Sequence, residues 1–248
     1  MNPFVVGALL TAYVAALSLV VGALPSTRMR AVVYSMPIPM SLLSLLGPDL
    51  VDPHVITGLL VNASFFWLVA LGDRLGWHRL PSTLAATVAY AGAAYVLNAG
   101  PSLTVILAVA VSLVIWGGLL PVIRRIPPLA VSPVATVGVQ RLLIVFLTAA
   151  GAVAIAGILG PYVVTFPYTG ITMSLTYPGS VVPFARSFWI NGLPPLLAYG
   201  TGLAAGAAVG IPMWGAVLCG LAGWGIVTAG VAWAQRSAPE PEAESSVA

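Results

Sequence analysis

The stretch HVITGLLVNASFFWLVALG, residues 54–72, decides the fold class of this chain. It contains no acidic residue, no lysine and no arginine. An α-helix rises about 1.5 Å per residue, so an uncharged apolar run of this length is close to the ~30 Å thickness of a bilayer's hydrocarbon core. The stretch therefore predicts a transmembrane helix.

Similar apolar stretches fill most of the 248 residues, of which 60% are hydrophobic and 6% are charged, against roughly 25% charged in an ordinary soluble domain. A soluble fold could not cover its surface with so few charges. We predict an all-α, polytopic helical membrane bundle of about nine transmembrane helices, the first of them a span and not a cleavable signal. The apolar segments are 2–24, 31–47, 54–72, 82–98, 102–121, 136–159, 162–177, 184–208 and 211–234.

The arginines predict how these segments are oriented. The chain has nine of them and no lysine, and they stand between apolar segments, a pattern typical of topology signals and not of nucleic-acid binding. If all nine segments cross and the N-terminus lies outside, every arginine falls on the cytoplasmic side, while Asp49 and Asp52 fall outside. We therefore predict an N-out, C-in protein of the cell membrane, meaning the plasma or inner membrane.

Two short segments, 31–47 and 162–177, are interrupted by proline and resemble each other. Each has a Val-Val pair, a small hydroxyl residue and a bulky residue before the proline, Pro37 or Pro167. An asparagine follows 25 residues after Pro37 and 24 residues after Pro167 (62 − 37 and 191 − 167). This similarity predicts an inverted repeat of 4+1+4 helices in which helices two and seven are broken.

The repeat divides the chain into four parts. We expect a first four-span repeat at 1–98, a connecting helix and cytoplasmic loop at 99–135, and an inverted second repeat at 136–234. The remaining residues, 235–248, are polar and rich in Pro and Glu, with nothing to bury. They predict a disordered cytoplasmic tail.

The second repeat resembles the GlpM family of small four-span membrane proteins. The resemblance lies in a broken aromatic segment, an arginine and a tryptophan that open the next helix, and a Pro-x-x-x-Tyr motif. It implies a fused, inverted pair of GlpM-like units and a link to exopolysaccharide production, without a defined biochemical activity. The matching residues are Tyr162, Pro167, Arg186, Trp189, Pro195 and Tyr199.

The helix breaks predict where a solute binds. A proline inside a helix frees the carbonyl four residues earlier, and in lipid that carbonyl needs a new partner or a solute. Interrupted spans at matching positions of two repeats are a pointer to a transport site. The alternative is that the asparagines join helices and the hydroxyls bond to their own helices. The predicted lining is Tyr34, Ser35, Asn62, Thr165, Tyr168, Thr169 and Asn191, with Arg186 available to a lipid phosphate.

No acid, histidine or lysine lies in the middle of a predicted span, so the usual proton relay of a coupled transporter is missing. Positive half-helix ends favour an anion or a hydroxyl-rich group. Our first hypothesis is a small membrane transporter or lipid flippase with an uncharged midplane site. Its expected partners are membrane lipids and a small polar, anionic or lipid-phosphate solute, and not nucleic acid.

Two other functions stay open. One is a non-catalytic subunit of a membrane protein complex that assembles envelope lipid or polysaccharide. The other is a membrane enzyme with an outer-face metal site at Asp49, Asp52 and His54, although the flanking prolines make this stretch typical of a turn in which Asp52 caps the next helix. The preferred hypothesis includes no catalytic residue, metal or cofactor.

Overall fold

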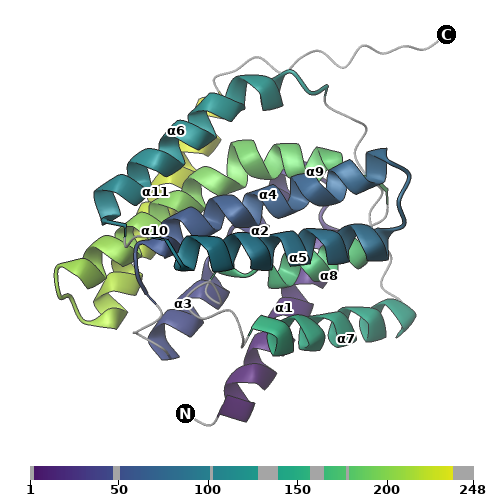
Figure 1. Ribbon diagram of the computed structural model, residues 1–248, viewed down its shortest axis with the longest axis horizontal. Coiled ribbons are helices and arrows are strands. Elements are labelled where there is room, and N and C mark those ends of the chain that lie inside the picture. Colours follow the sequence, from purple (N-terminus) through teal and green to yellow (C-terminus); the bar gives the residue numbers. More distant parts are fainter. Residues whose placement is uncertain are drawn as a thin grey trace.

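The computed structural model describes residues 3–46, 51–100, 103–127, 139–156, 165–176 and 179–236, and within these ranges every regular element is a helix (Figure 1). The predicted all-α class is confirmed. The predicted tail beyond Arg236 lies outside the described residues, as do Asp49 and Tyr162. The helices are α1 Pro3–Ala23, α2 Thr27–Tyr34, α3 Ile38–Leu46, α4 His54–Arg74, α5 Arg79–Asn98, α6 Val105–Arg124, α7 Val139–Ala156, α8 Tyr168–Thr176, α9 Val182–Ser187, a π-helical turn Phe188–Gly192, α10 Leu193–Ala208 and α11 Met213–Arg236.

Four of the described helices are long and apolar enough to cross a membrane, and with the composition they mark the chain as a membrane protein. Shorter apolar stretches lie at Gly7–Ala23 in α1 and Leu142–Gly151 in α7. The larger count of about nine crossings stays a prediction. The four long spans are His54–Arg74, Arg79–Leu97, Val105–Arg124 and Met213–Ala234.

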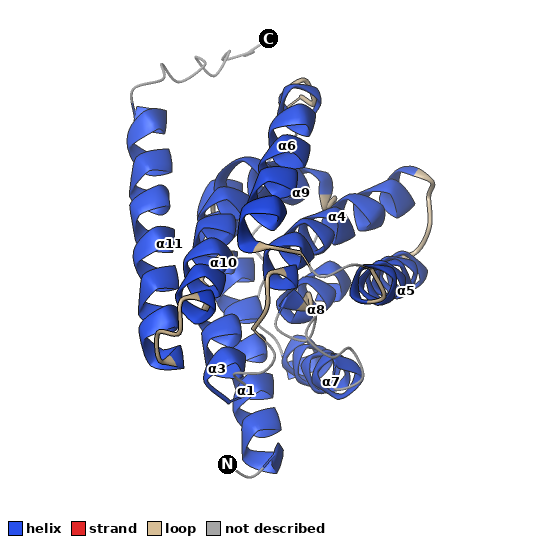
Figure 2. Ribbon diagram, turned by 60° about the vertical axis from the view of Figure 1, so that its left-hand side comes forward, coloured by secondary structure: helices blue, strands red, loops and turns tan. Residues whose placement is uncertain are grey.

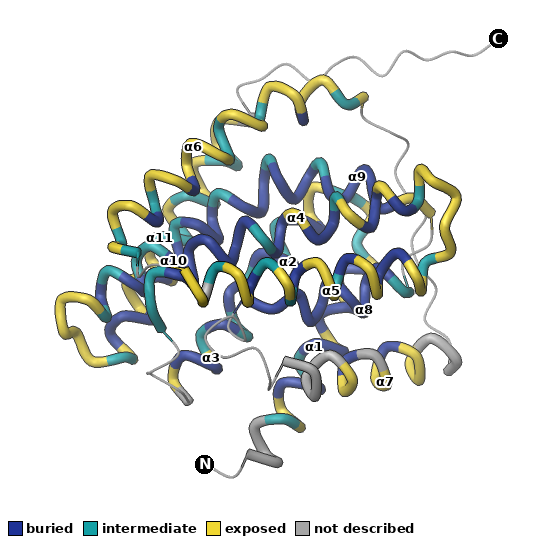
Figure 3. Tube along the Cα trace, viewed as in Figure 1, coloured by how far each residue is buried: buried dark blue, intermediate teal, exposed yellow. Residues whose placement is uncertain are grey.

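Helix α4 lies at the centre of the molecule, and α6 and α11 lie at its edge. In the apolar window of α4, 72% of the residues are buried inside the protein, against 17% for α6 and for α11 (Figure 3). Helix α4 packs against α5, α6, α8, α9 and α10. A helix that is apolar on all sides can be buried on all sides, whereas α6 and α11 leave apolar side chains exposed, as lipid-facing helices do.

The chain breaks at both predicted prolines. Segment 31–47 divides into α2 and α3, and the described part of segment 162–177 enters α8 directly after Pro167. Helices α3 and α8 each have nine residues and each begin at the residue after the proline. In both, the proline carbonyl accepts the first hydrogen bond at 2.8 Å, from the N–H of Ser41 for Pro37 and from that of Ile171 for Pro167. The two breaks thus share one local geometry.

Segment 184–208 is a continuous helical stretch with an irregular middle. A π-helical turn, Phe188–Gly192, joins α9 to α10, whose second and third residues are Pro194 and Pro195. These prolines cannot donate backbone hydrogen bonds, and the wider turn accommodates the interrupted pattern. A Cβ at Gly192 would lie 2.8 Å from the carbonyl oxygen of Ala31 in α2, so glycine lets α2 pack directly on this turn.

The helix axes are not all parallel. In Figure 2, α10 and α11 run along the page, whereas α5 and α7 are seen nearly end-on. Helices α10 and α11 form one packed pair and α4 and α5 form another, while α1 packs across α7. The helix breaks lie between these groups, because α2 contacts the π-helical turn and α8 contacts α1, α4, α5 and α7.

Candidate functional site

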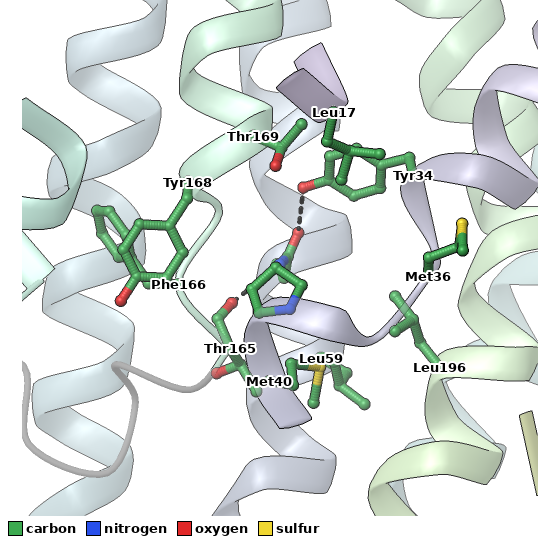
Figure 4. A pocket seen from close by; sticks show the side chains of 12 residues that line it. Leu17, Tyr34, Met36, Met40, Leu59, Thr165, Phe166, Tyr168, Thr169 and Leu196 are labelled. Carbon is green, nitrogen blue, oxygen red and sulfur yellow. Dashed lines mark hydrogen bonds between the residues drawn. The ribbon is translucent and has the colours of Figure 1, made fainter. Parts of the chain in front are cut away.

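A cavity of about 40 Å³ lies between the two helix breaks (Figure 4). Five of the predicted site residues line it, from three separate parts of the chain. The remainder of its wall is apolar, including Leu17 of α1 and Leu196 of α10. The five polar residues are Tyr34 at the end of α2, Asn62 of α4, Thr165 at the break, and Tyr168 and Thr169 at the start of α8.

Asn62 connects the two sides of the cavity. Its Nδ2 donates a hydrogen bond to the carbonyl oxygen of Thr165 at 2.9 Å, and its Oδ1 accepts a long one from the hydroxyl of Tyr34 at 3.4 Å (Figure 4). The side chain is 7% exposed. One residue therefore combines the two roles considered for it, because it joins the broken segments and also faces a cavity.

Thr165 is held firmly at the second break. Its hydroxyl lies 2.8 Å from that of Tyr90 in α5. Behind it is Gly58 of α4, where an added Cβ would overlap the Thr165 hydroxyl. This close approach fixes the backbone of residues 165–167 against α4.

Thr169, the second residue of α8, differs from the other lining residues in its hydrogen bonding. It is 5% exposed, and its hydroxyl makes no hydrogen bond to any residue in the described ranges. In Figure 4 this hydroxyl points to the same space as the Tyr34 hydroxyl. Backbone N–H groups in the first turn of a helix also lack intrahelical acceptors. In the first turn of α8, however, the N–H groups of Tyr168 and Ile171 already donate to the carbonyls of Phe166 and Pro167, so the unused donor at the start of α8 is the Thr169 hydroxyl.

Three phenylalanine rings that do not line the cavity hold Tyr34 in place. The Tyr34 ring meets three phenylalanine rings edge-on, with centroids 5.2 Å away for Phe66, 5.5 Å for Phe184 and 5.0 Å for Phe188. All four residues are buried. Met36, Met40 and Leu196 also line the cavity, and every polar lining residue is buried.

The other three predicted site residues do not line this cavity. The hydroxyl of Ser35 donates to the carbonyl of Val32 at 2.7 Å and accepts from the indole N–H of Trp224 at 3.3 Å. Asn191 donates to the Ser187 hydroxyl at 3.1 Å within the helix that carries both. Arg186 is partly buried in the last turn of α9, and its Nε has no hydrogen-bond partner in the described part of the chain.

The described residues that line the cavity include no acid, histidine, lysine or arginine. An ion pair lies instead between the end of α4 and the start of α5, where Arg79 Nε is 3.1 Å from Asp73 Oδ1. Arg79 also donates to the carbonyls of Ser174 and Gly179, and Asp73 accepts the backbone N–H of Val181 at 3.1 Å. This pair, which we call the Asp73–Arg79 clamp, holds the end of α8 and the chain that leads into α9.

Sequence reasoning missed the clamp. Its one signal is that Asp73 is the only acidic residue between His54 and the C-terminal tail. The carbonyls that Arg79 binds belong to residues about a hundred positions away and carry no side-chain pattern of their own.

The stretch considered for an outer metal site forms a helix start. Asp52 accepts the backbone N–H of His54 at 2.8 Å, and its other oxygen lies 3.2 Å from His54 Nδ1. Within the described residues, no three His, Cys, Asp or Glu side chains are grouped closely enough to hold a metal ion. Asp49 lies outside those residues. The observed geometry is that of the turn in which Asp52 caps α4.

Helix α6 is joined to the π-helical turn by two tryptophans. The Trp116 indole donates to the carbonyl of Trp189 at 3.0 Å, and the Trp189 indole donates to the carbonyl of Trp116 at 3.4 Å. A second, mostly apolar cavity of about 440 Å³ lies nearby between α4, α6, α10 and α11, lined by Ile56, Ser112 and Val227 among others. The sequence patterns did not indicate this cavity.

Comparison with known proteins found no relative of this chain. No protein-family model, no curated protein and no solved structure matches the chain. The GlpM-like resemblance therefore stays a prediction, and the function has to be inferred from the cavity between the helix breaks.

Proposed function

We propose that this protein is a small-solute transporter of the cell membrane and that its solute occupies the cavity between the two helix breaks. The observation that carries the proposal is the meeting of five buried polar side chains from distant parts of the chain around one cavity. Polar groups at membrane depth are unfavourable unless they bond to each other or to something that passes. A tightly packed, dry contact between the breaks would instead favour a purely structural subunit.

The cavity volume favours a small solute over a lipid headgroup. A single water needs at least about 10–15 Å³ by the same measure, so about 40 Å³ holds a few atoms. A flippase would need a far wider path, and aromatic and aliphatic side chains line the walls here. We therefore prefer the transporter branch of the hypothesis.

The proposal includes the inverted repeat, which matched contacts support. At each break, the hydroxyl residue two positions before the proline is bonded by an aromatic residue of the opposite repeat. Tyr90 of α5 reaches Thr165, and Trp224 of α11 reaches Ser35. Correspondingly, α5 packs on α8 and α11 packs on α3. A two-fold axis in the membrane plane would generate pairs of this kind, with α6 as the odd connector.

Nine crossings with the N-terminus outside complete the proposal. The described helices begin or end at arginines where this topology needs a cytoplasmic end: α4 ends at Arg74, α5 begins at Arg79 and α6 ends at Arg124. Two inverted halves around one site would alternate its access between the two sides of the membrane.

Reconstitution of the purified protein into liposomes tests the proposal. We expect wild-type protein to carry a small solute, and Asn62→Leu to reduce the flux at least about tenfold, because it removes the amide that bridges the cavity. Thr87→Val is the matched control, since the Thr87 hydroxyl bonds only within its own helix, to the carbonyl of Thr83. Equal flux through folded wild type and the Asn62 variant would contradict the site assignment.

A further inference from the structure

Two helix N-termini face the cavity. Helix α3 contributes Pro39 and Met40 from its first turn, and helix α8 contributes Tyr168 and Thr169 from its own. The N-terminal end of a helix carries partial positive charge, and residues from two such ends line this one cavity. The proximity of these ends is a first reason to expect an electron-rich ligand.

The side chains give a second, independent reason. The Thr169 hydroxyl faces the cavity, is nine-tenths buried and has no partner in the described chain. Asn62 uses one amide N–H on the Thr165 carbonyl, and an amide has two. Two oxygens of the lining already accept hydrogen bonds, the Thr165 carbonyl from Asn62 and Asn62 Oδ1 from the Tyr34 hydroxyl. The lining therefore has two unused donors for a ligand, the Thr169 hydroxyl and the second N–H of the Asn62 amide.

The charge of the lining restricts the ligand further. Among the described residues that line the cavity none is a carboxylate, so none of them compensates the desolvation of a metal cation or an ammonium group. No arginine, lysine or histidine faces it either, so a doubly charged anion such as sulfate lacks the full countercharge that it would need. The partial positive charges of the helix ends and the neutral hydrogen-bond donors can stabilise a small ion that carries a single negative charge.

We propose that the cavity binds a small monovalent inorganic anion of the halide or nitrate class and that the protein conducts it. This inference rests on the proposed transport function and names its substrate class. The anion sits against α8 in preference to α3, because Pro37 and Pro39 remove two N–H donors from the start of α3. Thr169 is then the residue whose hydroxyl touches the anion.

Potential-driven flux from proteoliposomes tests this inference. Vesicles loaded with potassium chloride or potassium nitrate receive a potassium ionophore, and an ion-selective electrode follows the anion that leaves. Wild-type protein releases chloride or nitrate but not sulfate. Thr169→Val lowers the flux about tenfold or more, because a hydrogen bond to a charged group is lost, and Thr169→Ser restores it. Thr87→Val, in α5, keeps the wild-type rate.

The remaining outcomes separate this inference from the proposed function. Vesicles that release a neutral probe such as glycerol or urea, but neither anion, overturn the anion assignment and leave transport intact. Wild-type vesicles that release no tested solute, with protein that is monodisperse and helical, overturn both. Anion flux that is unchanged in Thr169→Val overturns the binding site, and Asn62→Asp gives a second check because a carboxylate in the cavity must block anion entry.

Discussion

Gly58 and Gly192 show how single residues position the helix breaks. Gly58 lets α4 touch the Thr165 hydroxyl, and Gly192 lets the π-helical turn touch the carbonyl of Ala31. Neither has a positive φ, so each is required by close contact and not by backbone conformation. The sequence shows both as ordinary small residues in apolar segments, because the atom that excludes a side chain comes from a distant helix. Such contacts could not have been predicted from spacing.

These glycines give a stability prediction. Gly192→Ala places a Cβ 2.8 Å from a backbone oxygen that cannot rotate away, so we expect the free energy of unfolding to fall by about 1–3 kcal/mol. Thermal unfolding in detergent, followed by circular dichroism, measures the change. Gly92→Ala in α5 is the control, because a Cβ there meets nothing within 4 Å. Equal stability of the two variants would mean that the packing of α2 on the turn is looser than described.

At the scale of elements, helix positions followed from the sequence more completely than the site did. The length of an apolar segment predicts a span directly, and segment 54–72 lies where α4 is found. A proline predicts a break because it lacks an N–H, and segment 31–47 lies where the chain divides into α2 and α3. The site was predicted as symmetric, with Asn62 and Asn191 in equal roles. Only Asn62 lines the cavity, because the π-helical turn packs on α2 and Asn191 bonds to Ser187.

The Asp73–Arg79 clamp leads to a prediction about local opening. It joins the loop between α4 and α5 to the end of α8, so Arg79→Gln should raise hydrogen exchange across residues 174–182. Mass spectrometry of deuterated peptides measures the effect. Arg74→Gln, which removes an exposed arginine that makes no ion pair in the described chain, should leave those peptides unchanged. A similar increase in both variants would show that net charge, and not the clamp, closes this region.

At the scale of the whole molecule, the decisive measurement is on which side of the membrane each loop lies. It is decisive because α5 and α7 are inclined to α10 and α11 (Figure 2). In a Cys219→Ser background that removes the exposed native thiol, Asp49→Cys should react with an impermeant thiol reagent added to intact cells. Arg74→Cys and Arg186→Cys should react only after the cells are opened. Labelling of Arg186→Cys in intact cells would show that a short segment fails to cross, and the inverted repeat would fall with it.

The aromatic partners of Ser35 and Thr165 affect how the chain matures during synthesis. Ser35 leaves the ribosome early, yet the indole that bonds to it belongs to Trp224 in the last helix. Thr165, by contrast, meets a Tyr90 that is already in place. The hydrogen bond at Ser35 can therefore form only after almost the entire chain has been made, whereas the partner of Thr165 is present when Thr165 is added. A ribosome stalled before α11 would hold a protein in which Thr165 can bond to Tyr90 while Ser35 still lacks its indole partner.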